Sequence, residues 1–536
     1  NHSSLTATML GLDANPTTLL FTLAAGLLTL RPVMRYLRSY PEKDIPIVYT
    51  LFQPFGIPGV LLPTTRRWTT GLDWMWIRRG QTYTTNETIR LVPLLAGDSE
   101  LWTCDMDVAR QTVVGSHRSS WVKPAEMSRL LLIWGMNIVA ADGQVWRKHR
   151  RIMGPAFGTE LYQLVWKESI RLYREMISVE EWESESAAKV PVVQELTLKF
   201  AFLVICRCGF GFPSSWADPP KSSDTEMSAQ EALRIVSNSH MIKNIMPLWM
   251  LRLLPFPKIQ AVRTAHDIFL QFMRFQIDAR KEMVRESEVN EKDAFTMLIQ
   301  ANEDEAGKNQ LDESELIGNI YILMFAGHET TAQSLASTLA YLALDESLQD
   351  ELLNHILDVV GPSGDPVYED HHKLNKIAAA FFEGTRLFPS AQVLIRQATE
   401  DTLLTVQNAL GEEGTRKIPV TQGTLAIVDM VGVQYNPRYF EDPTAFKPSR
   451  WYDLPVESDI FSGFSVGPRA CLGRKFATVE AICFLSLLIR DWKVSPLLNS
   501  DESISQWKAR VLDARFGMTL RIADVPVRFE RRKHGL

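Results

Sequence analysis

Residues 464–473 read Phe-Ser-Val-Gly-Pro-Arg-Ala-Cys-Leu-Gly and are followed by the helix-like run R-K-F-A-T-V-E-A-I. The stretch presents one cysteine, Cys471, in a loop between Gly467 and Gly473, both of which allow tight backbone turns. The following helix points its N-terminus at the sulfur, and Arg469 adds positive charge nearby. Because both effects favour the thiolate over the thiol, Cys471 is predicted to be a reactive or ligating thiolate.

A thiolate presented in this way can be a nucleophile or a metal ligand. A nucleophile needs a nearby base, but no histidine lies within 60 residues of Cys471 on either side. The metal-ligand interpretation is therefore the better one. The other four cysteines, Cys104, Cys206, Cys208 and Cys483, form no C-x-x-C pair and no disulfide framework, so the body is expected in a reducing compartment.

The longest helix signal lies upstream of this loop. Asp312, with Glu315 three residues later, resembles a capping box, and the apolar pattern continues to about Leu344. Such a helix spans roughly 50 Å and crosses a whole domain. Because it is apolar on most faces, we expect it to be central.

The fold class follows from the rest of the chain, which is mostly helical in pattern and has no internal repeat. Short strand signals occur around Leu394, near Leu425 and in the run F-G-M-T-L-R-I near the end. The expected fold is mainly α with small β-sheets (α+β). A net charge of −6 over 536 residues gives no reason to expect a nucleic-acid partner.

The N-terminal region predicts a membrane anchor. Ala14–Leu30 are 17 uncharged residues, and Arg31, Arg35 and Arg38 follow them. The positive-inside rule places the N-terminus in the lumen and the rest in the cytosol. Residues 1–38 are therefore predicted to be a signal anchor. A cleaved signal peptide is the alternative, although no clear cleavage site follows the apolar run.

The domain boundaries follow from this anchor and from the prolines after it. Residues 39–65 contain five prolines, too many for a straight spanning helix, and predict a hinge on the membrane surface. Residues 66–536 form the expected catalytic domain.

The cysteine loop is similar to the signature F-x-x-G-x-R-x-C-x-G of the cytochrome P450 family, the haem-thiolate monooxygenases. All five fixed positions match: Phe464, Gly467, Arg469, Cys471 and Gly473. The resemblance implies a cytochrome P450 fold and a haem b whose iron is bound by the Cys471 thiolate.

A second motif lies in the middle of the long helix. Residues 326–331 read A-G-H-E-T-T and resemble the family's oxygen-activation motif [AG]-G-x-[DE]-T. Ala326 and Thr330 are one turn apart and share a face, and Ala326 with Gly327 is expected to leave room for dioxygen. Glu329 and Thr330 are predicted to relay protons.

A third pair of segments resembles the family's scaffold. Glu383 and Arg386 match E-x-x-R, and F-K-P-S-R-W at residues 446–451 is similar to F-x-P-x-R-[FW], with Ser449 in place of the frequent Glu. The resemblance implies a structural triad of Glu383, Arg386 and Arg450 behind the haem loop.

The resemblance also implies contacts with the haem. Trp146 and Arg150 match W-x-x-x-R on one helix face, and together with Arg396 and Arg469 they are expected to bind the propionates. Phe464 is expected to pack against the thiolate side.

A basic cluster is expected to surround the thiolate face and to dock an acidic redox partner. Its members are Arg147, Lys148, His149, Arg150, Arg151, Arg474 and Lys475. Electrons are expected from an NADPH-cytochrome reductase, with cytochrome b5 as a second candidate donor. The expected location is the endoplasmic reticulum membrane, with the catalytic domain in the cytosol.

The expected function is oxygen insertion into a lipophilic substrate such as a terpenoid, a sterol or a fatty acid, as in secondary metabolism. Apolar residues from Leu248 to Pro257 favour entry from the bilayer, and residues 121–136, the Ala326 face and Ala391–Leu394 are the expected pocket neighbourhoods. One alternative is a reductase-independent isomerase or dehydratase acting on a hydroperoxide. Another is a membrane-bound haem carrier or sensor without enzymatic activity.

Overall fold

The computed structural model describes most of the chain after residue 44. The described residues are 26, 30–38, 45–65, 69–113, 120–128, 131–132, 134–212, 215–217, 227, 231–232, 235–236, 239, 256–286, 293–305, 310–361, 364–454, 461–517 and 519–532. The predicted anchor run Ala14–Leu30 and the apolar segment Leu248–Pro257 therefore lie almost entirely outside the described residues.

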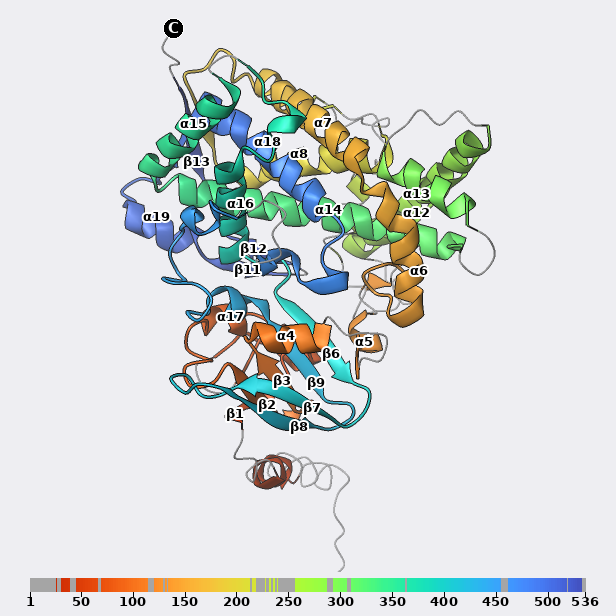
Figure 1. Cartoon of the computed structure of the whole chain (residues 1–536), viewed down its shortest axis with the longest axis vertical. Helices are drawn as coiled ribbons and strands as arrows, with labels where there is room; N and C mark the ends of the chain where they lie inside the picture. The colour runs from red at the N-terminus through yellow and green to blue at the C-terminus, as the bar shows by residue number, and fades with distance from the viewer. Residues whose placement is uncertain are drawn as a thin grey trace, which may run out of the picture.

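Most helices gather in one part of the molecule, and the largest sheet forms a second part beside them (Figure 1). The α-helices are α2 (Ile57–Leu61), α3 (Trp74–Ile77), α4 (Met106–Val113), α5 (Ala125–Ser128), α6 (Gly143–Met153), α7 (Thr159–Val179), α8 (Val193–Val204), α12 (Pro257–Arg285), α13 (Ala294–Glu303), α14 (Glu313–Leu342), α15 (Glu346–Val360), α16 (Asn375–Leu387), α17 (Met430–Gln434), α18 (Arg474–Asp491) and α19 (Ile504–Val511). Short 3-10 turns are η2 (Gly154–Ala156), η5 (Tyr368–Asp370), η6 (Pro448–Trp451), η7 (Ser462–Phe464) and η8 (Gly467–Arg469), and η3 (Ile205–Gly209) is a π-helix.

The strands form four sheets. The largest has the order β1 (Ile47–Phe52), β2 (Thr88–Ala96), β3 (Glu100–Thr103), β9 (Leu425–Asp429), β6 (Val393–Ala398) and β4 (Trp121–Val122), with β1–β2 and β3–β9 parallel and the other pairs antiparallel. The others are β10 (Trp492–Pro496), β13 (Val527–Arg531) and β5 (Ala187–Val190), the pair β7 (Thr402–Gln407) and β8 (Thr415–Val420), and the pair β11 (Ala514–Phe516) and β12 (Leu520–Ile522). Small sheets beside a helical body are what the sequence predicts.

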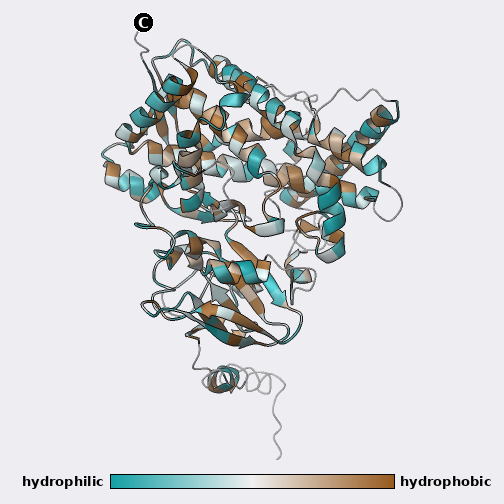
Figure 2. Cartoon of the chain, in the orientation of Figure 1, coloured by the Kyte–Doolittle hydropathy of each residue, from teal (hydrophilic) through white to brown (hydrophobic). Residues whose placement is uncertain are grey.

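Helix α14 is the central element of the helical part. Asp312 caps it and forms a capping box with Glu315, which confirms the predicted start. It contacts α8, α12, α16 and α18, and most of its side chains are buried. The outer helices instead carry hydrophilic and hydrophobic residues in alternating bands (Figure 2).

Two segments differ from the sequence-based expectation. Ile47–Phe52, inside the expected hinge, form strand β1 and pair with β2, so the folded body begins before residue 66. The run F-G-M-T-L-R-I includes the end of β11 and all of β12, which pair as a hairpin rather than forming one strand. Within the described residues, no helix has both the length and the apolar character that a membrane span requires.

The predicted triad lies where α16 meets η6. Arg386 donates from Nε and Nη2 to the two carboxylate oxygens of Glu383, at 2.9 and 2.8 Å. Arg450 Nε and the Lys447 backbone N–H donate to Oε1 at 3.2 and 3.0 Å, and Trp451 Nε1 donates to Oε2 at 2.9 Å. Both Glu383 and Arg386 are fully buried. The structure thus brings the three triad residues together.

Arg386 also fixes the loop that follows α17. Its Nη1 donates to the carbonyls of Gln434 and Pro443 at 2.6 and 2.8 Å, and its Nη2 donates to Ala445 at 3.0 Å. A buried guanidinium with all of these partners is stable only while its carboxylate is present.

We expect Glu383→Gln to lower the free energy of unfolding by about 3–5 kcal/mol, because it leaves the Arg386 charge buried without its carboxylate. Urea unfolding followed by circular dichroism measures the loss. Glu346→Gln is the control, because Glu346 pairs with Lys493 at the surface, where about 0–1 kcal/mol is expected. Similar losses in the two variants would contradict the scaffold role of Glu383.

Candidate active site

Cys471 lies in the loop between η8 and α18. Its backbone N–H donates to the Phe464 carbonyl at 2.9 Å, which closes the loop. Gly467 has a φ of +71°, so the predicted tight turn is present there. Gly473 also lies in a turn, which the Arg474 N–H closes on the Cys471 carbonyl at 3.4 Å, but its φ of −85° is one that any residue can adopt. Gly473 directs a backbone hydrogen bond to the Cys471 sulfur.

The surroundings of the Cys471 sulfur suit a metal-binding thiolate. Burial raises the pKa of the thiol, while the Gly473 hydrogen bond and the charges of Arg150 and Arg474 lower it. Cys471 lies among these groups but remains exposed, whereas the other four cysteines are buried. An accessible sulfur faced by a donor and by cations is prepared to ligate iron.

Three cations gather around a single carboxylate, Asp142. Arg469 pairs with Asp142 and donates from Nη1 to the Ala141 carbonyl at 2.9 Å, and the Lys123 backbone N–H donates to Asp142 at 2.8 Å. Burial, and then the charges of Arg396 and Arg469, lower the pKa of Lys123 to about 7. Burial and the charge of Arg469 lower the pKa of Arg396 to about 10.

Burial is the main cause of both lowered pKa values, and the repulsion between the neighbouring cations adds to it, while Asp142 acts in the opposite direction. A partner with two carboxylates would balance the cations. Haem carries two propionates, so the residues present fit this cofactor.

Trp146 and Arg150 lie on α6 but act at different places. The Arg469 guanidinium lies 4.5 Å from the centre of the Trp146 ring, so Trp146 joins the cation cluster. The charge of Arg150 acts on Cys471. That Arg150 contacts a propionate remains a prediction.

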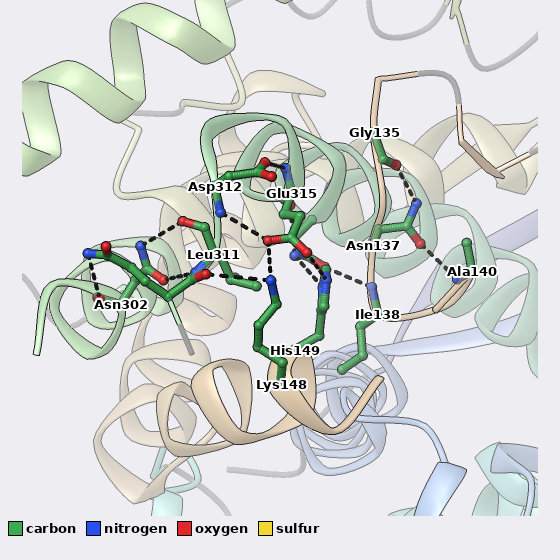
Figure 3. Close-up of polar contacts among 12 residues, drawn as sticks. Gly135, Asn137, Ile138, Ala140, Lys148, His149, Asn302, Leu311, Asp312 and Glu315 are labelled. Carbon is green, nitrogen blue, oxygen red and sulfur yellow. Dashed lines mark hydrogen bonds and ion pairs between the residues drawn. The ribbon is translucent and has the colours of Figure 1, made fainter. Parts of the chain in front are cut away.

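Helix α6 is held against the start of α14 by a polar network (Figure 3). Lys148 Nζ pairs with Glu315 Oε2 at 2.6 Å, and His149 Nε2 lies 3.3 Å from Glu315 Oε1. Asn319 Nδ2 lies 2.9 Å from His149 Nδ1, and Asn319 Oδ1 accepts from the Ile138 N–H at 2.8 Å. Burial lowers the pKa of His149 despite these partners. The helix that carries Trp146 and Arg150 therefore has a fixed position.

This network corrects the predicted docking cluster. His149 is fully buried and faces α14, and Lys148 is engaged by Glu315, so neither is part of an open basic surface. Arg151 pairs with Glu305 at 3.0 Å, but its side chain is 53% exposed, so it stays at the surface.

The middle of α14 places Thr330 one turn from Ala326. Thr330 Oγ1 donates to the Ala326 carbonyl at 2.8 Å. A Cβ on Gly327 would lie 3.0 Å from Ile205 Cδ1, so Gly327 permits close packing against η3. That Ala326 with Gly327 leaves room for dioxygen stays a prediction.

Glu329 is buried and held by residues far away in sequence. Thr519 and Arg521, in the β11–β12 hairpin, both donate to its carboxylate. Sequence reasoning missed these two residues and Lys123. Lys123 at least falls inside the 121–136 segment that was expected near the pocket, but no local pattern marks Thr519 or Arg521.

Phe464 joins an aromatic group beside the cysteine loop. Its ring centre lies 5.7 Å from that of Phe461 and 6.4 Å from that of Phe382, and Arg474 lies 5.9 Å from its ring. This packing fits the expected position on the thiolate side.

Comparisons with known proteins agree with this geometry. A cytochrome P450 family model matches residues 113–515. The chain is 37% identical over 425 residues to cytochrome P450 monooxygenase 124 of Postia placenta, covering 78% of this chain and 81% of the relative. It is 26% identical over 473 residues to cytochrome P450 monooxygenase prx9 of Penicillium rubens, covering 79% and 78%.

A solved zebra fish cytochrome P450 with abiraterone shares the fold. The TM-score is 0.65 at 21% sequence identity, over 86% of this chain and 98% of that one. The extent of the family match, together with a cysteine loop, a central helix and a cation cluster that suit a haem, leads to one conclusion: the chain belongs to the cytochrome P450 family.

Proposed function

We propose that this haem-thiolate monooxygenase is membrane-anchored and oxidises a lipophilic substrate of the terpenoid, sterol or fatty-acid type, using electrons from an NADPH-dependent reductase. The observation that carries the proposal is the accessible Cys471 sulfur, faced by the Gly473 hydrogen bond and by the charges of Arg150 and Arg474. A hydroperoxide isomerase would not need the Glu329–Thr330 pair, and the relatives are named monooxygenases.

When bound, haem supplies the iron centre at which dioxygen is activated. In this proposal Cys471 would hold the iron, and Trp146, Arg150, Arg396 and Arg469, joined by Lys123, would hold the propionates. We propose that Glu329 and Thr330 deliver protons to the site. The Thr330 hydroxyl can both donate and accept, and its bond to the Ala326 carbonyl keeps it on the face shared with Ala326.

The substrate class rests on the apolar surroundings of α14. Trp134, within the 121–136 segment, packs against Tyr321 of α14 with ring centres 4.6 Å apart, and Val393, at the start of β6, packs on the hydrophobic core. From these aromatic and aliphatic side chains next to the proposed site we infer a lipophilic substrate.

Membrane association is supported by exposed apolar residues near the N-terminus. In the helix at residues 30–38, Val33, Met34 and Leu37 are exposed, and in α2 Ile57 and Leu61 are 73% and 63% exposed. Large apolar side chains gathered at a surface are suited to a bilayer. We place the protein on the endoplasmic reticulum membrane, with the catalytic domain in the cytosol.

The docking surface for a reductase is the remaining basic part of the thiolate face. After His149 and Lys148 are removed from the predicted cluster, five residues stay in the proposed surface: Arg147, Arg150, Arg151, Arg474 and Lys475. An acidic partner such as a reductase or cytochrome b5 would be attracted there.

Replacing the proposed iron ligand tests the central assignment. We expect Cys471→Ser to abolish the red-shifted Soret band of the dithionite-reduced carbon monoxide complex, because a hydroxyl does not ligate iron as a thiolate does. The control is Cys483→Ser, in the helix α18 that follows the cysteine loop, where the new hydroxyl can keep the contact with the Trp166 carbonyl. A normal spectrum in Cys471→Ser would refute the assignment.

The proton relay is tested by Thr330→Ala. We expect the product formed per NADPH to fall by about tenfold, because a proton donor is lost. The assay uses dodecanoic acid, farnesol and cholesterol as probes, each with added reductase. Thr331→Ala is the matched control, since Thr331 is buried and donates to the Gly327 carbonyl at 3.1 Å, as Thr330 does to the Ala326 carbonyl. Equal coupling in the two variants would require another proton route.

The proposed membrane contact of α2 is tested on a variant that lacks residues 1–29. We expect Ile57→Glu with Leu61→Glu to lower binding to phosphatidylcholine vesicles by about tenfold, because two apolar side chains no longer enter the bilayer. Flotation measures the bound fraction. Ile504→Glu is the control, because Ile504 is similarly exposed but lies in α19. An equal loss in the control would argue against α2 as the contact.

A further inference from the structure

The β11–β12 hairpin contains an unfavourable pairing of charges. In its register Arg515 lies directly opposite Arg521. Like charges opposite each other in an antiparallel pair are destabilising, and these strands have only three residues each. A nearby negative charge is needed to offset the pair.

Glu329 of α14 supplies this charge. Arg521 approaches its Oε1 with Nε at 2.7 Å and Nη2 at 2.6 Å, and Thr519 Oγ1 donates to the same oxygen at 2.6 Å. The Glu329 side chain is 6% exposed and that of Arg521 is 36% exposed. A buried carboxylate is costly unless it is paired, so the hairpin and the carboxylate stabilise each other.

The same hairpin also reaches Thr330. The Leu520 N–H donates to the Ser390 carbonyl at 3.1 Å, and Ser390 Oγ lies 3.5 Å from the Thr330 carbonyl. Glu329 is therefore in direct contact with Thr519 and Arg521, and Thr330 is connected to Leu520 of the same hairpin through Ser390.

We infer that Thr519 and Arg521 are positioning residues for proton delivery: they hold the Glu329 carboxylate in place next to Thr330. This inference rests on the proposed function of Glu329 and Thr330. Arg521 is the most exposed of the three contacting groups, and the Thr519 hydroxyl can both accept and donate a proton.

The geometry assigns a different task to each residue. The Arg521 guanidinium provides the charge and two donors, which fix the direction of the carboxylate. Thr519 provides a hydroxyl whose bond to Oε1 links the carboxylate to the hairpin. Without Thr519 and Arg521, Glu329 would lose the contacts that the hairpin makes with it. A carboxyl group that is no longer held beside Thr330 transfers protons less effectively.

The test compares Arg521→Gln, Arg521→Lys and Thr519→Val in the full-length, haem-loaded protein. Arg515→Gln is the matched control, because it removes the same charge from the opposite position of the same hairpin. Dodecanoic acid, farnesol and cholesterol are the probes, with added reductase. We expect product per NADPH to fall by about tenfold in Arg521→Gln, with a smaller fall in Thr519→Val, partial rescue in Arg521→Lys and no change in Arg515→Gln.

A second measurement does not depend on turnover. The urea midpoint is compared for Glu329→Gln, Arg521→Gln and the double variant. We expect the double variant to have a midpoint close to that of the single variants, because both remove the same interaction. Additive shifts would overturn the contact itself.

The two measurements separate the inference from the proposed function. If Arg521→Gln and Arg515→Gln form equal product per NADPH while Thr330→Ala is uncoupled, the relay holds and the positioning role is wrong. If Thr330→Ala is also fully coupled, the proposed relay fails. A normal carbon monoxide spectrum in each variant shows that the haem site is intact.

Discussion

The fully buried carboxylate of Glu383 is the constraint on which the cysteine loop depends. It receives donors from α16, from the segment before η6 and from η6 itself, and those of Arg386 and Trp451 are buried away from competing water. An aromatic series continues from there: Trp451 contacts Phe461, with ring centres 5.2 Å apart, and Phe461 contacts Phe464. The Phe464 carbonyl then accepts the Cys471 N–H. The position of the sulfur is thus traced back to one ion pair.

Helix α14 combines three tasks along its length. Its first turns hold α6 through Glu315 and Asn319, its middle carries Glu329 and Thr330, and its later turns pack against α16. A helix that is buried on most faces can serve all three because its neighbours contact different turns. Its central position follows from composition, whereas the choice of neighbours follows from individual polar side chains.

The features that could be predicted from the sequence are those fixed by local spacing. Glu383 and Arg386 are three residues apart in a helix, Ala326 and Thr330 are four apart, and the cysteine loop is continuous, so each motif specifies its own geometry. The contacts that were missed join distant parts of the chain. Thr519 and Glu329 are 190 residues apart, and Ile205, from another helix, packs beside Gly327. Strand β1 was missed because prolines around it masked its alternation and suggested a hinge.

The opposed arginines of the β11–β12 hairpin also bear on the order in which the protein folds. Two strands of three residues are too short to be stable alone, and charge repulsion weakens their pairing further. The hairpin gains its counter-charge only when α14 is already in place and presents Glu329. We therefore expect it to form late, as a small unit of low local stability attached to α14. On this expectation, the contacts that complete the acid of the proposed relay are among the last to form and the first to open.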